Sequence, residues 1–359
     1  MSINLNAACP RSPAMHPRGW REWIAASNLA SPAAGPASML DSIVAIAAIV
    51  IPVFGLIGIG FASVKTKLLK MSVGDGLADF VFIVALPVLL FKTLATAELG
   101  DVSPWPFLIS YFAGVAVVWT ASDFTVRRIF GRDARSGVTA GVSGGFSNIA
   151  LVGLPFSISA FGEAGSVPAA TLLAVHLPIM MTVSTLLVQR AERIDGTSEA
   201  GVSLGQTLLR VGGNLIRNPL IVGILAGVAW WLTGLPITGI PRRLIDMLTA
   251  PAVPCALFAL GISLARYGIS GNIRPALVIA GLKLVLLPAC VYLLVSNLTD
   301  LPQIWINVAT MAAACPTGVN AWLIASRFGT GLALSANVIT MSTAMAVVSM
   351  TVWLAILTH

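Results

Sequence analysis

The sequence predicts an all-α integral membrane protein with ten transmembrane helices. Of its 359 residues, 57% are hydrophobic and only 10% are charged. Soluble domains average about a quarter charged residues, so this chain has too few polar side chains to face water on all sides. The apolar runs are long enough for helical spans of about 20 residues, and they lack the polar and apolar alternation of a membrane β-barrel.

Charged residues and clusters of glycine or proline divide the apolar sequence into ten runs. These runs cover 42–64, 76–97, 104–123, 137–161, 167–189, 218–234, 246–265, 275–296, 302–326 and 332–357. Residues 39–189 therefore hold five spans, and a charged connector at 190–217 leads to five more in 218–359. Residues 1–38 contain Pro, Ser and Arg but no long apolar run, so we expect a disordered tail or an extension ahead of a true start at Met39.

The basic residues indicate which way the spans cross the membrane. Fourteen Lys and Arg residues fall in the loops on one side, and only Arg242 and Arg243 fall in the loops on the other. Cytoplasmic loops carry an excess of Lys and Arg. We therefore expect a multi-pass protein of the cytoplasmic or inner membrane with the connector inside the cell and both termini outside the cytoplasm.

Composition argues against several other classes of protein. The net charge of +7 is distributed between the spans as topology signals, so no nucleic acid partner is expected. The four cysteines lack metal-ligand or Cys-x-x-Cys spacing, and no HExxH or P-loop motif is present. We expect no metal, no cofactor and no enzymatic activity.

The two halves are related by a fixed offset of 167 residues. The superposed pairs include Pro52 and Pro219, Gly60 and Gly227, Asp79 and Asp246, Pro87 and Pro254, Phe91 and Phe258, and Gly162 and Gly329. Coincident Pro, Asp and Gly residues indicate an internal duplication. Because each copy has five spans, the second enters the membrane inverted, an arrangement typical of secondary transporters that hold their substrate near the bilayer midplane.

Spans four and nine both contain helix breakers and amides near their middle. Proline removes a backbone donor, and an interrupted helix is tolerated in a bilayer where protein or a water-filled cavity satisfies the freed groups. The N-termini of half-helices suit an anion, and asparagine can donate and accept hydrogen bonds. The alternative is a pair of proline kinks with Asn residues linking neighbouring helices. The predicted substrate-binding residues at these breaks are Asn148, Pro155, Pro316, Thr317, Gly318 and Asn320.

Four strings in residues 39–359 resemble the auxin efflux carrier family, in its bacterial branch of malonate-transporter-like proteins. They are Ile51–Gly60, Phe80–Phe91, Asn148–Gly162 and Pro316–Ala321. The resemblance implies two inverted halves whose spans four and nine cross at their proline breaks, forming a site for an organic anion such as malonate or an auxin-like weak acid. It implies Pro155 and Pro316 as crossover prolines and Asn148 and Asn320 as amide ligands. The connector is much shorter than the central loop of the plant carriers, so an auxin substrate does not follow.

Ionisable residues inside the spans are further candidates. Lys283 lies roughly 14 Å into span eight at 1.5 Å per residue, where it is predicted to bind the anion or to contribute to coupling; the alternative is that it snorkels. His176 is the one histidine within a span and suits proton coupling, although a hydrogen-bonded packing role is the alternative. For Asp79 and Asp246 we expect capping or charge pairing, and for Lys92 we expect snorkelling.

The leading hypothesis is an alternating-access carrier of a small organic anion, with the bilayer and a homodimeric copy of the chain as further partners. A sodium-coupled symporter of the bile-acid type is an alternative that would require a cluster of acidic or carbonyl ligands. A membrane sensor that binds the same ligands without transporting them is another. An intramembrane enzyme is disfavoured because no span offers a nucleophile, a base and an orienting partner.

Overall fold

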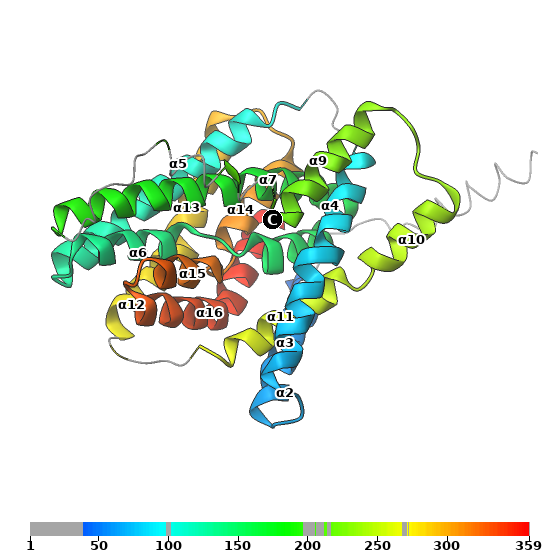
Figure 1. Cartoon of the computed structure of the whole chain (residues 1–359). Coiled ribbons are helices and arrows are strands. Elements are labelled where there is room, and N and C mark those ends of the chain that lie inside the picture. Colours follow the sequence, from blue (N-terminus) through cyan, green and yellow to red (C-terminus); the bar gives the residue numbers. More distant parts are fainter. Residues whose placement is uncertain are drawn as a thin grey trace, which may run out of the picture. The chain divides into compact units, whose positions relative to one another are not determined.

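The computed structural model describes residues 39–97, 102–196, 205, 212–213, 217–267, 271 and 273–358 (Figure 1). The expected tail at 1–38 and much of the expected connector lie outside the described residues. Contacts divide the chain into two units, Met1–Ala45 and Ile46–His359. Of the first unit the structure describes only the helical start of α2, and the description below concerns the second.

All regular elements in the described ranges are helices, and four of them are single π-helical segments, labelled η. The elements are α2 (Met39–Lys65), α3 (Met71–Phe80), η1 (Val81–Ala85), α4 (Leu86–Ala95), α5 (Trp105–Phe124), η2 (Thr125–Ile129), α6 (Ala134–Gly145), η3 (Ile149–Gly153), α7 (Leu154–Ile194), α9 (Pro219–Leu232), α10 (Gly239–Thr249), α11 (Ala252–Leu264), α12 (Ile273–Gly281), η4 (Leu282–Leu286), α13 (Leu287–Leu298), α14 (Gln303–Ala314), α15 (Asn320–Arg327) and α16 (Leu332–Thr358). The expected all-helical fold is confirmed for the described part of the chain.

Seven helices in the described residues are long and apolar enough to cross a membrane. They are Ile43–Lys65, Met71–Ala95, Trp105–Ile129, Ile149–Ile194, Gly239–Leu264, Ile273–Leu298 and Leu332–Thr358. The longest is interrupted at Gly162, whose φ of 63° lies in the left-handed region that favours glycine. The apolar segment Pro219–Leu232 is shorter, and α6, α14 and α15 are each too short to span a bilayer alone.

Two helix pairs pack closely through glycine. Helix α4 lies beside α9 (Figure 1), and α2 packs against α11. A Cβ atom at Gly60 would lie 2.3 Å from the carbonyl oxygen of Phe258, and one at Gly227 would lie 2.8 Å from that of Phe91. Because these neighbours are backbone atoms that cannot rotate away, the absence of a side chain at both positions allows the close approach of the helices.

Ion pairs join α4 to α10 and α3 to the residues just after α11. Lys92 Nζ lies 2.6 Å from an Asp246 carboxylate oxygen, and Arg266 lies 2.5 Å from Asp75. The charge pairing expected for Asp246 is therefore observed. Lys92 was expected to snorkel; instead its ammonium group is held by a carboxylate of α10, because α4 and α10 lie against each other.

The start of α6 is capped by two aspartates. The Asp133 carboxylate accepts a hydrogen bond from the Ser136 N–H at 2.9 Å, and the Asp195 carboxylate accepts from the N–H groups of Ala134 and Arg135 at 3.0 Å each. Partial burial opposes ionisation of Asp133, but the Ser136 hydrogen bonds and nearby guanidinium groups outweigh it and hold its pKa below the ordinary value. Asp195 lies in the expected connector, so the end of α7 is tied directly to the start of α6.

Candidate functional site

The two predicted helix breaks contact each other. The first lies between Gly145, the end of α6, and Ile149, the start of η3; the second lies between Ala314, the end of α14, and Asn320, the start of α15. Across the contact, the Asn148 N–H donates to the Pro316 carbonyl at 2.9 Å, and the Gly318 N–H donates to the Phe146 carbonyl at 2.8 Å. Backbone groups freed by one break are therefore satisfied by the other.

The local sequence explains why the backbone becomes extended at both breaks. Phe146 and Cys315 have ψ angles of 100° and 149°, which end α6 and α14. Cys315 precedes a proline, a position where the helical conformation is disfavoured. A Cβ atom at Gly318 would lie 3.0 Å from the Phe146 ring, so a glycine suits this tight contact.

A cavity of about 300 Å³ adjoins this contact. Its polar lining consists of Ser147, Asn148, His176, Asn218 and Asn320, and most of its other side chains are apolar, including Phe82, Phe146, Leu177, Leu220 and Leu323. Of the residues predicted from sequence, Asn148, His176, Gly318 and Asn320 line the cavity. Pro155, Pro316, Thr317 and Lys283 do not.

Asn148 holds its amide group in one orientation. The side-chain oxygen Oδ1 accepts a hydrogen bond from the Leu151 N–H at 3.3 Å and caps η3. The amide nitrogen Nδ2 is buried and has no hydrogen-bond partner among the described residues. An unpaired buried donor costs about 1–3 kcal/mol, so this nitrogen is ready to donate to an acceptor in the cavity.

His176 is 1% exposed and is packed among aromatic rings. Its ring centroid lies 4.8 Å from that of Phe146 and 5.8 Å from that of Tyr111. Within the described part of the chain its Nε2 atom has no hydrogen-bond partner. The packing alternative therefore lacks the hydrogen bond that was expected with it, and the proton-coupling role stays a prediction.

Lys283 is fully buried in η4. Its Nζ atom donates to the Ala313 carbonyl at 2.6 Å, near the second break, and to the Ser147 hydroxyl at 2.8 Å, in the first. Lys283 thus does not snorkel. It lies behind the cavity wall and links the two breaks, instead of contributing an atom to the cavity lining.

Thr317 and Pro155 both lie near the breaks but outside the cavity lining. The Thr317 hydroxyl donates to the Ser143 carbonyl at 2.7 Å, and its N–H donates to Ser342 Oγ at 3.0 Å, so Thr317 braces the second break against α6 and α16. Pro155 lies beyond the first break, within the continuous helical run Ile149–Ile194 and directly after the π-helical segment η3. The wider hydrogen-bond spacing of η3 changes the backbone register just before this proline, which has no N–H to donate.

Sequence reasoning missed two polar residues of the lining. Ser147 immediately precedes Asn148, but nothing in its spacing distinguishes it from other serines. Asn218 caps α9, and its Oδ1 accepts from the Leu220 N–H at 2.9 Å. The Asn–Pro pair at 218–219 is a helix-start signal, but it does not reveal that this helix begins beside the cavity.

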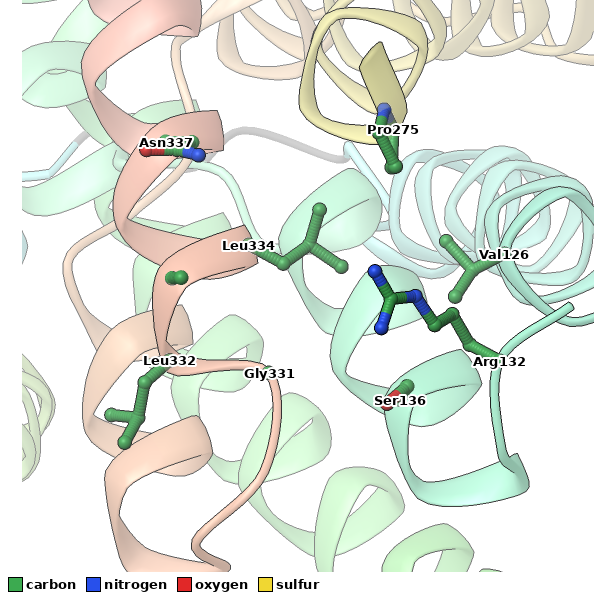
Figure 2. A pocket seen from close by; sticks show the side chains of 9 residues that line it. Val126, Arg132, Ser136, Pro275, Gly331, Leu332, Leu334 and Asn337 are labelled. Atoms are coloured by element: carbon green, nitrogen blue, oxygen red, sulfur yellow. The ribbon is translucent and has the colours of Figure 1, made fainter. Parts of the chain in front are cut away.

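A second cavity of about 300 Å³ lies among η2, α6, α12 and α16. Figure 2 shows the Arg132 guanidinium in the space between Leu334 and Val126, with Ser136 below it. Its lining shares no residue with the cavity at the breaks and contains none of the predicted site residues.

A family model described as Membrane transport protein matches residues 45–354. The chain belongs to this family of membrane transporters, the auxin efflux carriers. The resemblance noted in the sequence is thus confirmed. Membership of this family identifies the protein as a transporter and not an enzyme.

Two relatives of this transporter carry names. A protein of Rhizobium meliloti (strain 1021), named "Putative malonate transporter", is 28% identical over 315 residues, which cover 85% of this chain and 94% of the relative. An "Uncharacterized transporter" of Methanothermobacter thermautotrophicus is 26% identical over 278 residues, covering 76% of this chain and 86% of the relative.

In the described residues of this chain, no group of three or more His, Cys, Asp or Glu side chains is placed to hold a metal ion.

Proposed function

We propose that this protein is a secondary transporter that moves a small carboxylate, with malonate as the first candidate, by alternating access. The observation that carries the proposal is the buried Nδ2 donor of Asn148, which has no partner within the described ranges and belongs to a residue that lines the cavity where two broken helices meet. A carboxylate is acceptor-only and accepts several hydrogen bonds. It therefore complements a site whose free buried amide is a donor.

The helix starts at the site favour the same charge. Segment η3 begins directly after Asn148, and α15 begins at Asn320, both of which line the cavity. Helix N-termini present unpaired N–H groups and a partial positive charge, which stabilise an anion. The apolar remainder of the lining suits the carbon skeleton of an organic acid better than an inorganic anion.

The proposal includes ten spans arranged as two inverted repeats, with α14 and α15 as one broken span and α7 divided at Gly162. Two contacts support it. The offset of 167 residues relates Gly60 to Gly227 and Phe91 to Phe258. Gly60 of the first half packs on Phe258 of the second, and Gly227 of the second half packs on Phe91 of the first. In addition, Gly162 and Gly329, which the offset also relates, share a φ of 63°. Reciprocal contacts of this kind are expected when two copies face each other across a pseudo-two-fold axis.

The distribution of basic residues supports an inner-membrane orientation with both termini outside the cytoplasm. In that orientation Asn218 and Leu323 lie toward the cytoplasmic ends of their spans, so the cavity would face the cytoplasm. A binding site that is reached from one side at a time is the requirement of alternating access.

The test is uptake of labelled malonate by proteoliposomes that contain the purified protein. A proton gradient, a sodium gradient, a membrane potential or no gradient is imposed, and unlabelled carboxylates compete. We expect saturable uptake that protein-free liposomes lack and that one gradient accelerates. Acceleration by sodium alone would favour the sodium-coupled alternative. Absence of saturable uptake for every carboxylate tested would contradict the proposed function, and binding without flux would favour the sensor.

A further inference from the structure

Ser147 is a cavity residue with an unusual set of hydrogen bonds. It is 1% exposed, and its hydroxyl oxygen accepts from Lys283 Nζ at 2.8 Å and from the Tyr111 hydroxyl at 2.9 Å. Both donors are fully buried, and neither lines the cavity. They approach Ser147 from η4 and α5, behind the first helix break.

These two hydrogen bonds use the accepting capacity of Ser147. A hydroxyl group has two acceptor lone pairs and one donor hydrogen, and a lysine ammonium group has donors only. With both lone pairs occupied, the Ser147 hydrogen is the one part of the group left to bond. No hydrogen bond donated by Ser147 is found among the described residues, although Ser147 lines the cavity.

We propose that Ser147 donates a hydrogen bond to the substrate carboxylate, and that Lys283 and Tyr111 are positioning residues that hold its hydroxyl in the donor orientation. This inference rests on the proposed function, because it assigns a ligand within the same cavity. The Ser147 hydroxyl and the Asn148 amide, on adjacent residues, together form a donor pair at the first break. Lys283 acts on the anion through Ser147 and by its charge.

The surroundings of Lys283 support this division of roles. No carboxylate of a described residue forms an ion pair with it, and its nearest polar contacts are a carbonyl and the Ser147 hydroxyl. A buried cation without an acidic partner is costly. Because hydrogen bonds at a hydroxyl oxygen diverge at a roughly tetrahedral angle, an anion bonded to Ser147 would lie about 4.5–5 Å from Nζ and would serve as the missing counter-charge.

The first experiment measures malonate uptake by the purified full-length protein. Ser147→Ala should raise the half-saturation concentration about 13- to 160-fold, the range for a hydrogen bond to a charged group, with a maximal rate close to wild type. The matched control is Ser157→Ala, because Ser157 is also a 1% exposed serine but does not line the cavity and has no hydrogen-bond partner in the described structure. Unchanged half-saturation in Ser147→Ala would overturn the proposal.

The positioning role is tested by combining variants. Tyr111→Phe removes one hydroxyl, keeps the ring and should raise the half-saturation concentration several-fold, as should Lys283→Met if it folds. In a Ser147→Ala background, Tyr111→Phe should add nothing, because its target is absent. A fully additive effect of Tyr111→Phe would show that Tyr111 acts independently of Ser147 and would overturn the positioning role.

A second measurement is independent of malonate. Ser147→Cys is exposed to a negatively charged and to a positively charged methanethiosulfonate reagent, and modification is compared with that of the wild-type protein. Preferential reaction with the anionic reagent, lost in Lys283→Met, would support an anion-facing Ser147 even if no carboxylate is transported, in which case the proposed function alone fails. No modification above background, or a preference for the cationic reagent, would overturn the inference even if malonate is transported.

Discussion

Replacing Asn148 tests the candidate site most directly, because its two side-chain atoms have separate roles. The Nδ2 donor is buried and has no partner among the described residues, in a side chain that lines the cavity, whereas Oδ1 caps η3 through the Leu151 N–H. Asn148→Ala removes both. Loss of a hydrogen bond to a charged substrate costs about 1.5–3 kcal/mol, which corresponds to a rise of about 13- to 160-fold in half-saturation concentration at 1.36 kcal/mol per factor of ten.

Asn148→Asp separates the two roles. An aspartate retains an oxygen that can cap η3. The Asp variant therefore avoids the loss of about 0.5–2 kcal/mol in folding stability that follows from removing a cap. It also replaces the donor with a negative charge. Two like charges 4 Å apart at an effective dielectric constant of 20 repel each other by about 4 kcal/mol. The Asp variant should therefore be more stable than the Ala variant and yet transport a carboxylate less well.

The assay is labelled malonate uptake at matched expression, together with the thermal stability of the purified variants. Asp133→Ala is the control, because Asp133 caps α6 through Ser136 but does not line the cavity. It should lose stability to a similar degree and keep the wild-type half-saturation concentration. If Asn148→Ala leaves that concentration unchanged, or if Asn148→Asp transports as well as wild type, Asn148 is not a ligand of the anion.

Three further predictions concern packing, coupling and acid stability. Gly60→Ala should lower the free energy of unfolding by about 1–3 kcal/mol through overpacking, because its Cβ would meet a backbone carbonyl. Gly58→Ala should be neutral or stabilising, because a Cβ at Gly58 would have no described atom within 4 Å. If His176 relays protons, His176→Gln should flatten the pH dependence of malonate flux, and a retained profile would remove it from the mechanism. Because the pKa of Asp133 is held low in the folded state, Asp133→Asn should cost stability at neutral pH, and the difference from wild type should shrink as pH falls below about 3.9, the unfolded value. Thermal scans across pH check this sign.

The helix breaks show how far local sequence could predict the site. Gly144–Gly145 and Cys315–Pro316 end helices for reasons contained in a few neighbouring residues, so both interruptions were predictable. Pro155 itself does not interrupt the helix: it follows the π-helical segment η3 inside the continuous run Ile149–Ile194, and the break lies before it, between Gly145 and Ile149. The exact place of the break depends on its contact with the second break, which local sequence does not contain.

Long-range partners were beyond prediction from spacing. Lys283 is 136 positions from Ser147, and Lys92 is far along the chain from Asp246. Depth in a span identified Lys283 as an unusual residue, but hydrophobic periodicity contains no information about which helix lies opposite. Ser147 therefore has no distinguishing signal in the sequence, and only the tertiary structure places two donors against it.

The sequence by itself determined the helical membrane class, the position of the helix breaks and the family, because composition, local backbone preferences and recurring strings act over short distances along the chain. Only the tertiary structure decided that the two breaks pair with each other, that Lys283 lies behind the cavity wall, and that Asn218 and Ser147 join its lining. These are contacts between residues far apart in sequence, and they depend on how close the glycine-containing helices approach and on which unpaired backbone groups they bring together.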